Sequence, residues 1–147
     1  MIVMNIDNLN KEASMSKLFN SIPHQLLMQK TIRPNEPGYY VKHTDEWMMT
    51  PWKDYVDQVC AAAKSLIHLG VEFGQHVSIL GINRPEWVIF DLAAMMIGAI
   101  PSGIYRTDSS KEVEYIINHS DSLVVLAEND EQWQKINYVR GSCPNLK

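Results

Sequence analysis

The stretch GVEFGQHVSILGINRPEWVIFDLAAMMIGAIPSGIYRT, from Gly70 to Thr107, decides the fold. Residues 77–81 form a short, nearly continuous apolar run, which is typical of a strand covered on both faces. A helix is predicted to begin at Pro85, because a proline at the first helical position loses no hydrogen bond. Gly98 ends this helix, and the apolar residues 100–105 predict a second strand. A strand, a helix and a strand in this order predict a parallel α/β sheet.

The residues before this stretch predict smaller elements. Residues 1–25 are expected to be a loosely structured leader, although residues 24–30 are compatible with a short helix. Residues 31–38 contain two prolines and a glycine, which predict a loop. Two strands of a hairpin are expected at residues 39–41 and 47–49.

An amphipathic helix is expected after the hairpin. Thr50 is predicted as its N-cap, with Pro51 at the first helical position. Gly70 is expected to end it, and Gly70 and Gly74 supply the positive φ angles of the following turn. Its apolar face is predicted from helical spacing to contain Tyr55, Val56, Val59, Cys60, Ala63, Leu66 and Ile67.

The residues after Thr107 continue the alternation of helix and strand. Ser109 and Glu112 have the spacing of a capping box, which predicts a helix to about Asn118. A buried strand is expected at residues 123–127 and a helix at residues 131–138. The predicted fold class is therefore α/β, a parallel βαβαβα three-layer domain preceded by a short hairpin and an amphipathic helix. Since a further strand is expected after Lys147, residues 26–147 are predicted to be the N-terminal part of an incomplete domain.

Composition excludes several classes of protein. With 147 residues, 46% of them apolar and 20% charged, the chain is long enough for one globular domain. The net charge of −4 argues against nucleic acid as a partner. Residues 88–104 are apolar but are broken by Asp91 and Pro101, so a buried helix and strand are expected rather than a transmembrane segment. Because no signal peptide is recognisable and Cys60 and Cys143 are far apart, two reduced thiols and a cytoplasmic location are predicted.

The sequence contains none of the common catalytic motifs. It lacks a GxxxxGK[ST] phosphate loop, a GxGxxG turn, HExxH, CxxC and a GxSxG elbow. The five histidines, at positions 24, 43, 68, 76 and 119, show no metal-ligand spacing and are interpreted as surface or turn residues. No residue is assigned to catalysis, to cofactor binding or to a metal.

Two segments remain candidates for ligand binding. Residues 81–85 join a strand to a helix N-terminus, where free N–H groups can hold an anion and Arg84 would add charge. The alternative is that Asn83 caps the helix and Arg84 is solvated, with Trp87 as a core or contact residue. Tyr105, Arg106, Thr107, Asp108 and Ser109 leave the carboxyl end of a strand, where ligands gather in open α/β sheets. Helix capping by Ser109 explains part of that polarity.

The sequence resembles the N-terminal part of the adenylate-forming, AMP-binding enzymes, and within them the long-chain acyl-CoA synthetases of the bubblegum type. The resemblance covers roughly residues 26–147. The residues that carry it are Trp52, Tyr55, Ala62, Leu66, Leu69–Val71, Gly74–Ile79, Asn83–Trp87, Asp91–Ala93, Gly98–Ala99, Gly103–Thr107, Glu112–Ser120, Val124–Asn129, Gln132, Lys135–Ile136, Pro144 and Leu146–Lys147.

This resemblance implies ligation of a fatty acid to coenzyme A, through an acyl-adenylate made from ATP with Mg²⁺. It also places the family's phosphate loop, adenine-binding segment, ribose-binding aspartate and lid lysine after residue 147, so no family catalytic residue is carried over. The chain alone is therefore expected to lack ligase activity and to bind no cofactor. Three interpretations stay open: a fragment, a truncated reading frame, or one half of a split enzyme whose partner is a complementary C-terminal chain. Such enzymes work on lipids, so a peripheral position at a membrane face is a further expectation. The alternatives are a stand-alone binding or regulatory module derived from the family, and an unrelated flavodoxin-like nucleotide binder.

Overall fold

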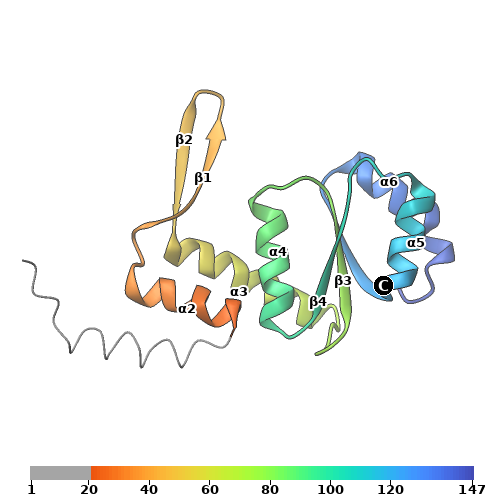
Figure 1. Cartoon of the computed structure of the whole chain (residues 1–147), viewed down its shortest axis with the longest axis horizontal. Helices are drawn as coiled ribbons and strands as arrows, with labels where there is room; N and C mark the ends of the chain where they lie inside the picture. The colour runs from red at the N-terminus through yellow and green to blue at the C-terminus, as the bar shows by residue number, and fades with distance from the viewer. Residues whose placement is uncertain (1–20) are drawn as a thin grey trace, which may run out of the picture.

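The computed structural model describes residues 21–147, and its elements follow the predicted order (Figure 1). The predicted leader lies outside the described residues apart from positions 21–25. The elements are α2 (Ile22–Ile32), β1 (Pro37–His43), β2 (Glu46–Pro51), α3 (Trp52–His68), β3 (His76–Leu80), α4 (Pro85–Met96), β4 (Ile100–Ile104), α5 (Ser110–Ser120), β5 (Ser122–Ala127), α6 (Asp130–Val139) and the 3₁₀ turn η1 (Arg140–Ser142).

The centre of the domain is a parallel sheet in the order β4-β3-β5. Strand β3 lies between the other two, and its residues 77–80 are at most 1% exposed, so the prediction of a strand covered on both faces is confirmed. Val77 pairs with Val124 of β5 and with Pro101 of β4. Figure 1 shows α4 on one side of the sheet and α5 with α6 on the other. The predicted three-layer α/β fold is therefore confirmed.

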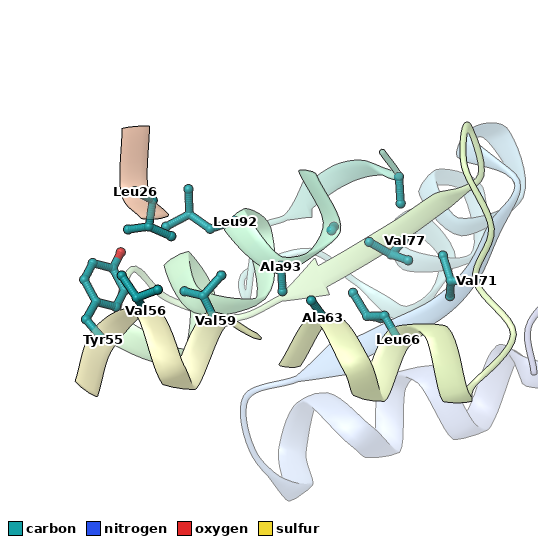
Figure 2. Packing of buried hydrophobic residues seen from close by; sticks show 12 residues of the cluster. Leu26, Tyr55, Val56, Val59, Ala63, Leu66, Val71, Val77, Leu92 and Ala93 are labelled. Atoms are coloured by element: carbon teal, nitrogen blue, oxygen red, sulfur yellow. The ribbon is translucent and has the colours of Figure 1, made fainter. Parts of the chain in front are cut away.

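Each face of the sheet has its own hydrophobic core. On the α3 and α4 side, Val59 and Leu66 pack with Val77 and Ala93 (Figure 2). On the opposite side, Leu80 of β3 packs with residues of α5 and α6. The alternation of side chains along β3 sends Val77 to the first core and Leu80 to the second, which explains why residues 77–80 are all buried. The polar residue among them, Ser78, is hydrogen-bonded to the Ser122 hydroxyl at 2.7 Å. The members of the second core are Leu80, Ile104, Val113, Ile117, Ile136, Val139 and Cys143.

The beginning of α3 differs from the prediction. Thr50 is not an N-cap: it belongs to β2 and pairs with Tyr39, while Pro51 is the N-cap and contributes no side-chain hydrogen bond. The free N–H groups of the first turn are bound instead by loop carbonyls. Trp52 N donates to Glu36 O at 3.0 Å, and Lys53 N donates to Pro34 O at 3.0 Å. The strand therefore runs directly into the helix, because the preceding loop supplies the cap.

Two smaller differences concern element ends and faces. The predicted loop at residues 31–38 is shorter, since α2 continues to Ile32 and β1 begins at Pro37. Ile67 was expected in the apolar face of α3 but is 59% exposed. It lies one residue beyond Leu66, and helical geometry therefore turns it away from the core. Gly70 and Gly74 do adopt the predicted positive φ angles, +76° and +80°.

Candidate functional site

The candidate site is the edge of the sheet at which β3, β4 and β5 end and at which α4, α5 and α6 begin. Because the three strands are parallel, their carboxyl ends meet at this edge, and in open α/β sheets ligands bind there. Both segments proposed from the sequence, residues 81–85 and residues 105–109, lie at this edge. The structure therefore brings them to one end of the sheet.

Glu128 holds the first of these segments. Its backbone N–H extends the sheet by donating to Leu80 O at 3.0 Å, and its carboxylate accepts from Ile82 N at 3.1 Å. The two chains approach so closely that a Cβ atom added to Gly81 would lie 2.8 Å from the Cβ of Glu128. Gly81 is therefore required by the contact with Glu128.

The beginning of α4 is organised by Arg84 and Glu86. Asn83 does not cap this helix, contrary to one of the two interpretations of the sequence, because Arg84 occupies the N-cap position and no side chain makes a cap bond. Pro85 at the first position removes one of the N–H groups that a cap would have to satisfy. Arg84 Nε donates to Glu86 Oε2 at 2.7 Å. This hydrogen bond lowers the pKa of Glu86 and raises the pKa of the Arg84 guanidinium.

A hollow of about 220 Å³ lies between the start of α4 and the ends of β3 and β5. Its lining includes the apolar side chains of Ile79, Leu126 and Trp87, with Arg84 and Glu128 as charged members. Trp87 is half-buried and also lies against β4, since a Cβ added to Gly103 would be 3.2 Å from its ring. Trp87 therefore contacts β4, and the same side chain forms a wall of the hollow.

The second segment, after β4, is a tight turn fixed by Lys135 of α6. Asp108 closes the turn through its backbone, with Asp108 N donating to Tyr105 O at 3.0 Å, and through its carboxylate, which accepts from Tyr105 N at 3.2 Å. Lys135 Nζ then donates to the carbonyls of Arg106 at 2.6 Å and Asp108 at 2.9 Å. The side chains of Tyr105, Arg106 and Thr107 are exposed on this turn.

The predicted capping box of α5 is confirmed immediately after this turn. Ser109 and Glu112 exchange both hydrogen bonds of the box, Glu112 N to Ser109 Oγ at 3.4 Å and Ser109 N to Glu112 Oε2 at 2.7 Å. These bonds lower the pKa of Glu112. The polarity of Ser109 is thus explained by helix capping, and the residues left facing solvent are those of the turn.

The sequence analysis missed Glu128 and Lys135. Glu128 bonds to Ile82, which lies 46 positions away in the sequence. Lys135 bonds to Arg106 and Asp108, which lie 29 and 27 positions away. No local sequence pattern marks either residue. The single glycine directly after a buried strand is the one signal that could have indicated a close approach at Gly81.

The described residues contain no group of three or more His, Cys, Asp or Glu side chains able to hold a metal ion. Cys60 and Cys143 are both unpaired thiols, and burial raises the pKa of Cys143. No helix within residues 21–147 is long and apolar enough to cross a membrane. At the carboxyl edge, Arg84 is bonded to Glu86, and the side chains of Glu128 and Lys135 are bonded to the backbone.

Comparison with known proteins identifies the class of protein that this fold and edge define. Residues 31–146 match the family described as AMP-binding enzyme, and the chain belongs to that family. The long-chain-fatty-acid–CoA ligase ACSBG2 of Xenopus laevis is 38% identical over 128 residues, covering 84% of this chain and 17% of that protein. The long-chain-fatty-acid–CoA ligase FadD15 of Mycobacterium bovis is 35% identical over 101 residues, covering 69% of this chain and 17% of that protein. The resemblance to bubblegum-type synthetases is therefore confirmed, and the chain spans 17% of the length of these relatives.

Solved structures agree with this assignment. The anthranilate CoA ligase AuaEII in complex with anthranoyl-AMP is 26% identical, with a TM-score of 0.74, over 84% of this chain and 23% of that chain. The N-terminal domain of FACL13 from Mycobacterium tuberculosis has a TM-score of 0.78 over 88% of this chain and 33% of that chain. At 23% identity the second likeness shows the fold alone.

Proposed function

We propose that this chain is the N-terminal part of a long-chain fatty acid–CoA ligase. The observation that carries the proposal is the 38% identity to the Xenopus laevis ligase across 84% of this chain. It is supported by the family match over residues 31–146. The parent enzyme would activate a fatty acid carboxylate with ATP as an acyl-adenylate, and coenzyme A would then displace AMP to give the thioester. Activation is needed because a carboxylate is a poor electrophile until a good leaving group is attached.

The residues at the carboxyl edge do not fit Mg²⁺ or a polyphosphate. Arg84 is paired with Glu86, Lys135 is bonded to two carbonyls, and Glu128 accepts from Ile82 N. Arg84 and Lys135 therefore have partners already, Arg106 is a further cation of this edge with an exposed side chain, and the described residues offer no metal-binding group. We derive no step of catalysis through these groups. In this proposal the described domain is a scaffold, and another part of the parent binds the nucleotide.

The part played by this chain is then structural positioning. Glu128 and Lys135 fix the two loops at the carboxyl edge, and Trp87 stands between them against Gly103. A carboxyl edge fixed in this way can present a defined surface to the part of the parent enzyme that binds the nucleotide. None of the residues at the edge has to take part in the reaction itself. Such rigid support is what a preorganised site requires from its scaffold.

A chimeric enzyme tests the proposal. The matched 128-residue segment of the Xenopus laevis ligase is replaced by this chain, and pyrophosphate exchange is measured with ATP, Mg²⁺ and a long-chain fatty acid. Exchange by the chimera and none by the 147-residue chain is the expected result. A folded chimera without activity contradicts the proposed equivalence, whereas exchange by the chain alone contradicts the scaffold role. A second chimera carries Trp87→Ala, which removes the ring that lines the hollow, and its exchange activity is compared with that of the first chimera.

We also propose that the parent works in the cytoplasm at a membrane face, because long-chain acyl groups partition into bilayers. The hairpin supports this placement, since Trp47 and Met48 are 65% and 59% exposed on β2, which projects from the domain in Figure 1. Co-sedimentation of the chain with lipid vesicles is the measurement. Binding should fall when Trp47 and Met48 are replaced by serine, and equal binding by both forms would contradict the placement.

A further inference from the structure

The hairpin of β1 and β2 carries two neighbouring methionines at the surface of the protein. Met48 is 59% exposed and Met49 is 45% exposed. The other methionines within residues 21–147, which are Met28, Met95 and Met96, are half-buried. Met95 and Met96 also pack against the hydrophobic core on the α3 and α4 side of the sheet. In this part of the chain, the methionines most open to solvent are therefore those of the hairpin.

The two methionines lie on opposite faces of the hairpin, because consecutive residues of a strand point to opposite sides. Met49 pairs with Tyr40 on one face, and Met48 pairs with Val41 on the other. Met48 and Val41 line a groove whose opposite wall includes Pro85 at the start of α4. A chemical change at both methionines therefore alters both faces of the hairpin at once.

The base of the hairpin is held without the methionines. Tyr39 OH donates to Gln58 Oε1 of α3 at 3.0 Å, and the Tyr39 ring meets the Tyr55 ring edge-on, with centroids 5.0 Å apart. Neither Met48 nor Met49 belongs to the hydrophobic cores on the two sides of the sheet. A change confined to their side chains can therefore leave the fold intact.

The exposed apolar side chains of the hairpin are Tyr40, Trp47, Met48 and Met49, so methionine supplies half of them. The charged residues around the turn between the strands are Lys42, Asp45 and Glu46, which give no net positive charge. Binding of a protein to a lipid surface scales with buried apolar area and with attraction between basic residues and anionic lipid. The hairpin lacks the second contribution, and its contact with lipid has to depend on the first.

Methionine is the apolar residue whose polarity can be changed reversibly. In its reaction with hydrogen peroxide, the thioether sulfur attacks one peroxide oxygen, an S–O bond forms and the O–O bond breaks. The sulfur loses two electrons, and the other oxygen leaves as water. The product is a polar sulfoxide, which methionine sulfoxide reductases return to the thioether. The reduction consumes two thiols and gives a disulfide and water.

We propose that Met48 and Met49 form a reversible oxidation site, and that their conversion to sulfoxides by peroxide releases the hairpin from a lipid surface. The release rests on the membrane placement proposed above, whereas the oxidation site does not. Oxidation leaves the charge of the hairpin unchanged and removes two of its four exposed apolar side chains. It therefore acts on the contribution that holds the hairpin at lipid.

Peptide mapping by mass spectrometry tests the oxidation site. The 147-residue chain is treated with hydrogen peroxide for increasing times, and sulfoxide is quantified at each position. Met48 and Met49 should be oxidised at least about fivefold faster than Met95 and Met96, because susceptibility follows exposure. Unfolding the chain in urea should remove this difference. The urea midpoint of the chain oxidised only at Met48 and Met49 should equal that of the untreated chain.

Co-sedimentation with phosphatidylcholine vesicles tests the release. The oxidised chain should bind at least about tenfold more weakly, since two side chains lose their apolar contact with lipid. Treatment with methionine sulfoxide reductases should restore binding. The matched control is the double variant Met48→Leu and Met49→Leu, which keeps the apolar surface but has no thioether in the hairpin. It should bind as the natural chain does, both before and after peroxide.

Four results would contradict the inference. Equal oxidation rates at Met48, Met49, Met95 and Met96 would refute the site. Unweakened vesicle binding by the oxidised chain would refute the release, and so would loss of binding by the peroxide-treated leucine variant, because other residues would then be responsible. Absence of vesicle binding by the untreated chain would contradict the membrane placement and with it the release. In that case the mapping still decides the oxidation site by itself.

Discussion

Replacing Gly81 by alanine tests the packing at the carboxyl edge most directly. Gly81 does not adopt a positive φ angle, so alanine is compatible with its backbone. On conformational entropy alone, the change would raise the free energy of unfolding by about 0.4–1 kcal/mol. The contact with Glu128 opposes this gain, because the new Cβ would lie 2.8 Å from the Cβ of Glu128. The Cβ of Glu128 is attached directly to the backbone and cannot rotate away. The contact is therefore relieved only when the backbone of the loop or of β5 moves.

Overpacking of this kind costs about 1–3 kcal/mol. We therefore expect Gly81→Ala to lower the free energy of unfolding by about 1–2 kcal/mol, measured by urea denaturation with an unchanged m-value. Gly141→Ala is the matched control. A Cβ at Gly141 meets nothing within 4 Å, and Gly141 has no positive φ angle either. This variant should be neutral or slightly more stable.

A double-mutant cycle identifies the cause. Glu128→Ala removes the carboxylate but keeps the Cβ, so Gly81→Ala should remain costly in that background. Glu128→Gly removes the Cβ as well, and there Gly81→Ala should cost nothing, which corresponds to a coupling of about 1–2 kcal/mol. If Gly81→Ala costs the same in both backgrounds, the contact between the two Cβ atoms is not the reason and the argument fails.

Three further changes have defined outcomes. Ser109→Ala should lower the free energy of unfolding by about 1 kcal/mol through loss of the capping box, whereas Thr50→Ala should change it by less than about 0.5 kcal/mol; similar costs in urea denaturation would contradict the assignment of caps. Lys135→Met should lower stability by about 1 kcal/mol and speed amide exchange at Asp108, and an unchanged exchange rate would show that the turn holds itself. Burial raises the pKa of Asp91 in the folded state. The folded chain then binds this proton more tightly than the unfolded chain, so the contribution of Asp91 falls as the pH rises through its folded pKa. Asp91→Asn should remove that decline and be more stable than the natural chain at neutral pH, and parallel pH profiles of the two forms would refute the role of Asp91.

Most of the fold was predictable because local sequence and global packing agree in it. Val77 and Leu80 belong to opposite cores, so the strand is apolar on both faces apart from Ser78, and such a nearly continuous run is visible in the sequence. Ser109 and Glu112 interact over three positions, so their spacing alone identifies the cap. The error at Thr50 has the opposite origin. A threonine followed by a proline has the chemistry of a helix start, but Glu36 O and Pro34 O already satisfy the first turn, and contacts from a preceding loop leave no periodic signal.

The arrangement at the carboxyl edge was predictable in place but not in detail. Residues 81–85 and 105–109 lie at one end of the sheet because the carboxyl ends of parallel strands meet there, which depends only on strand direction. The partners of those residues were not visible, because a charge such as Arg84 can be free or paired in the same sequence. Its bond to Glu86, and that of Lys135 to the turn, show that this edge is stiffened from within. The outer side of β5 is the reverse case, because no strand within residues 21–147 pairs with it, although Lys147 N donates to Leu123 O there.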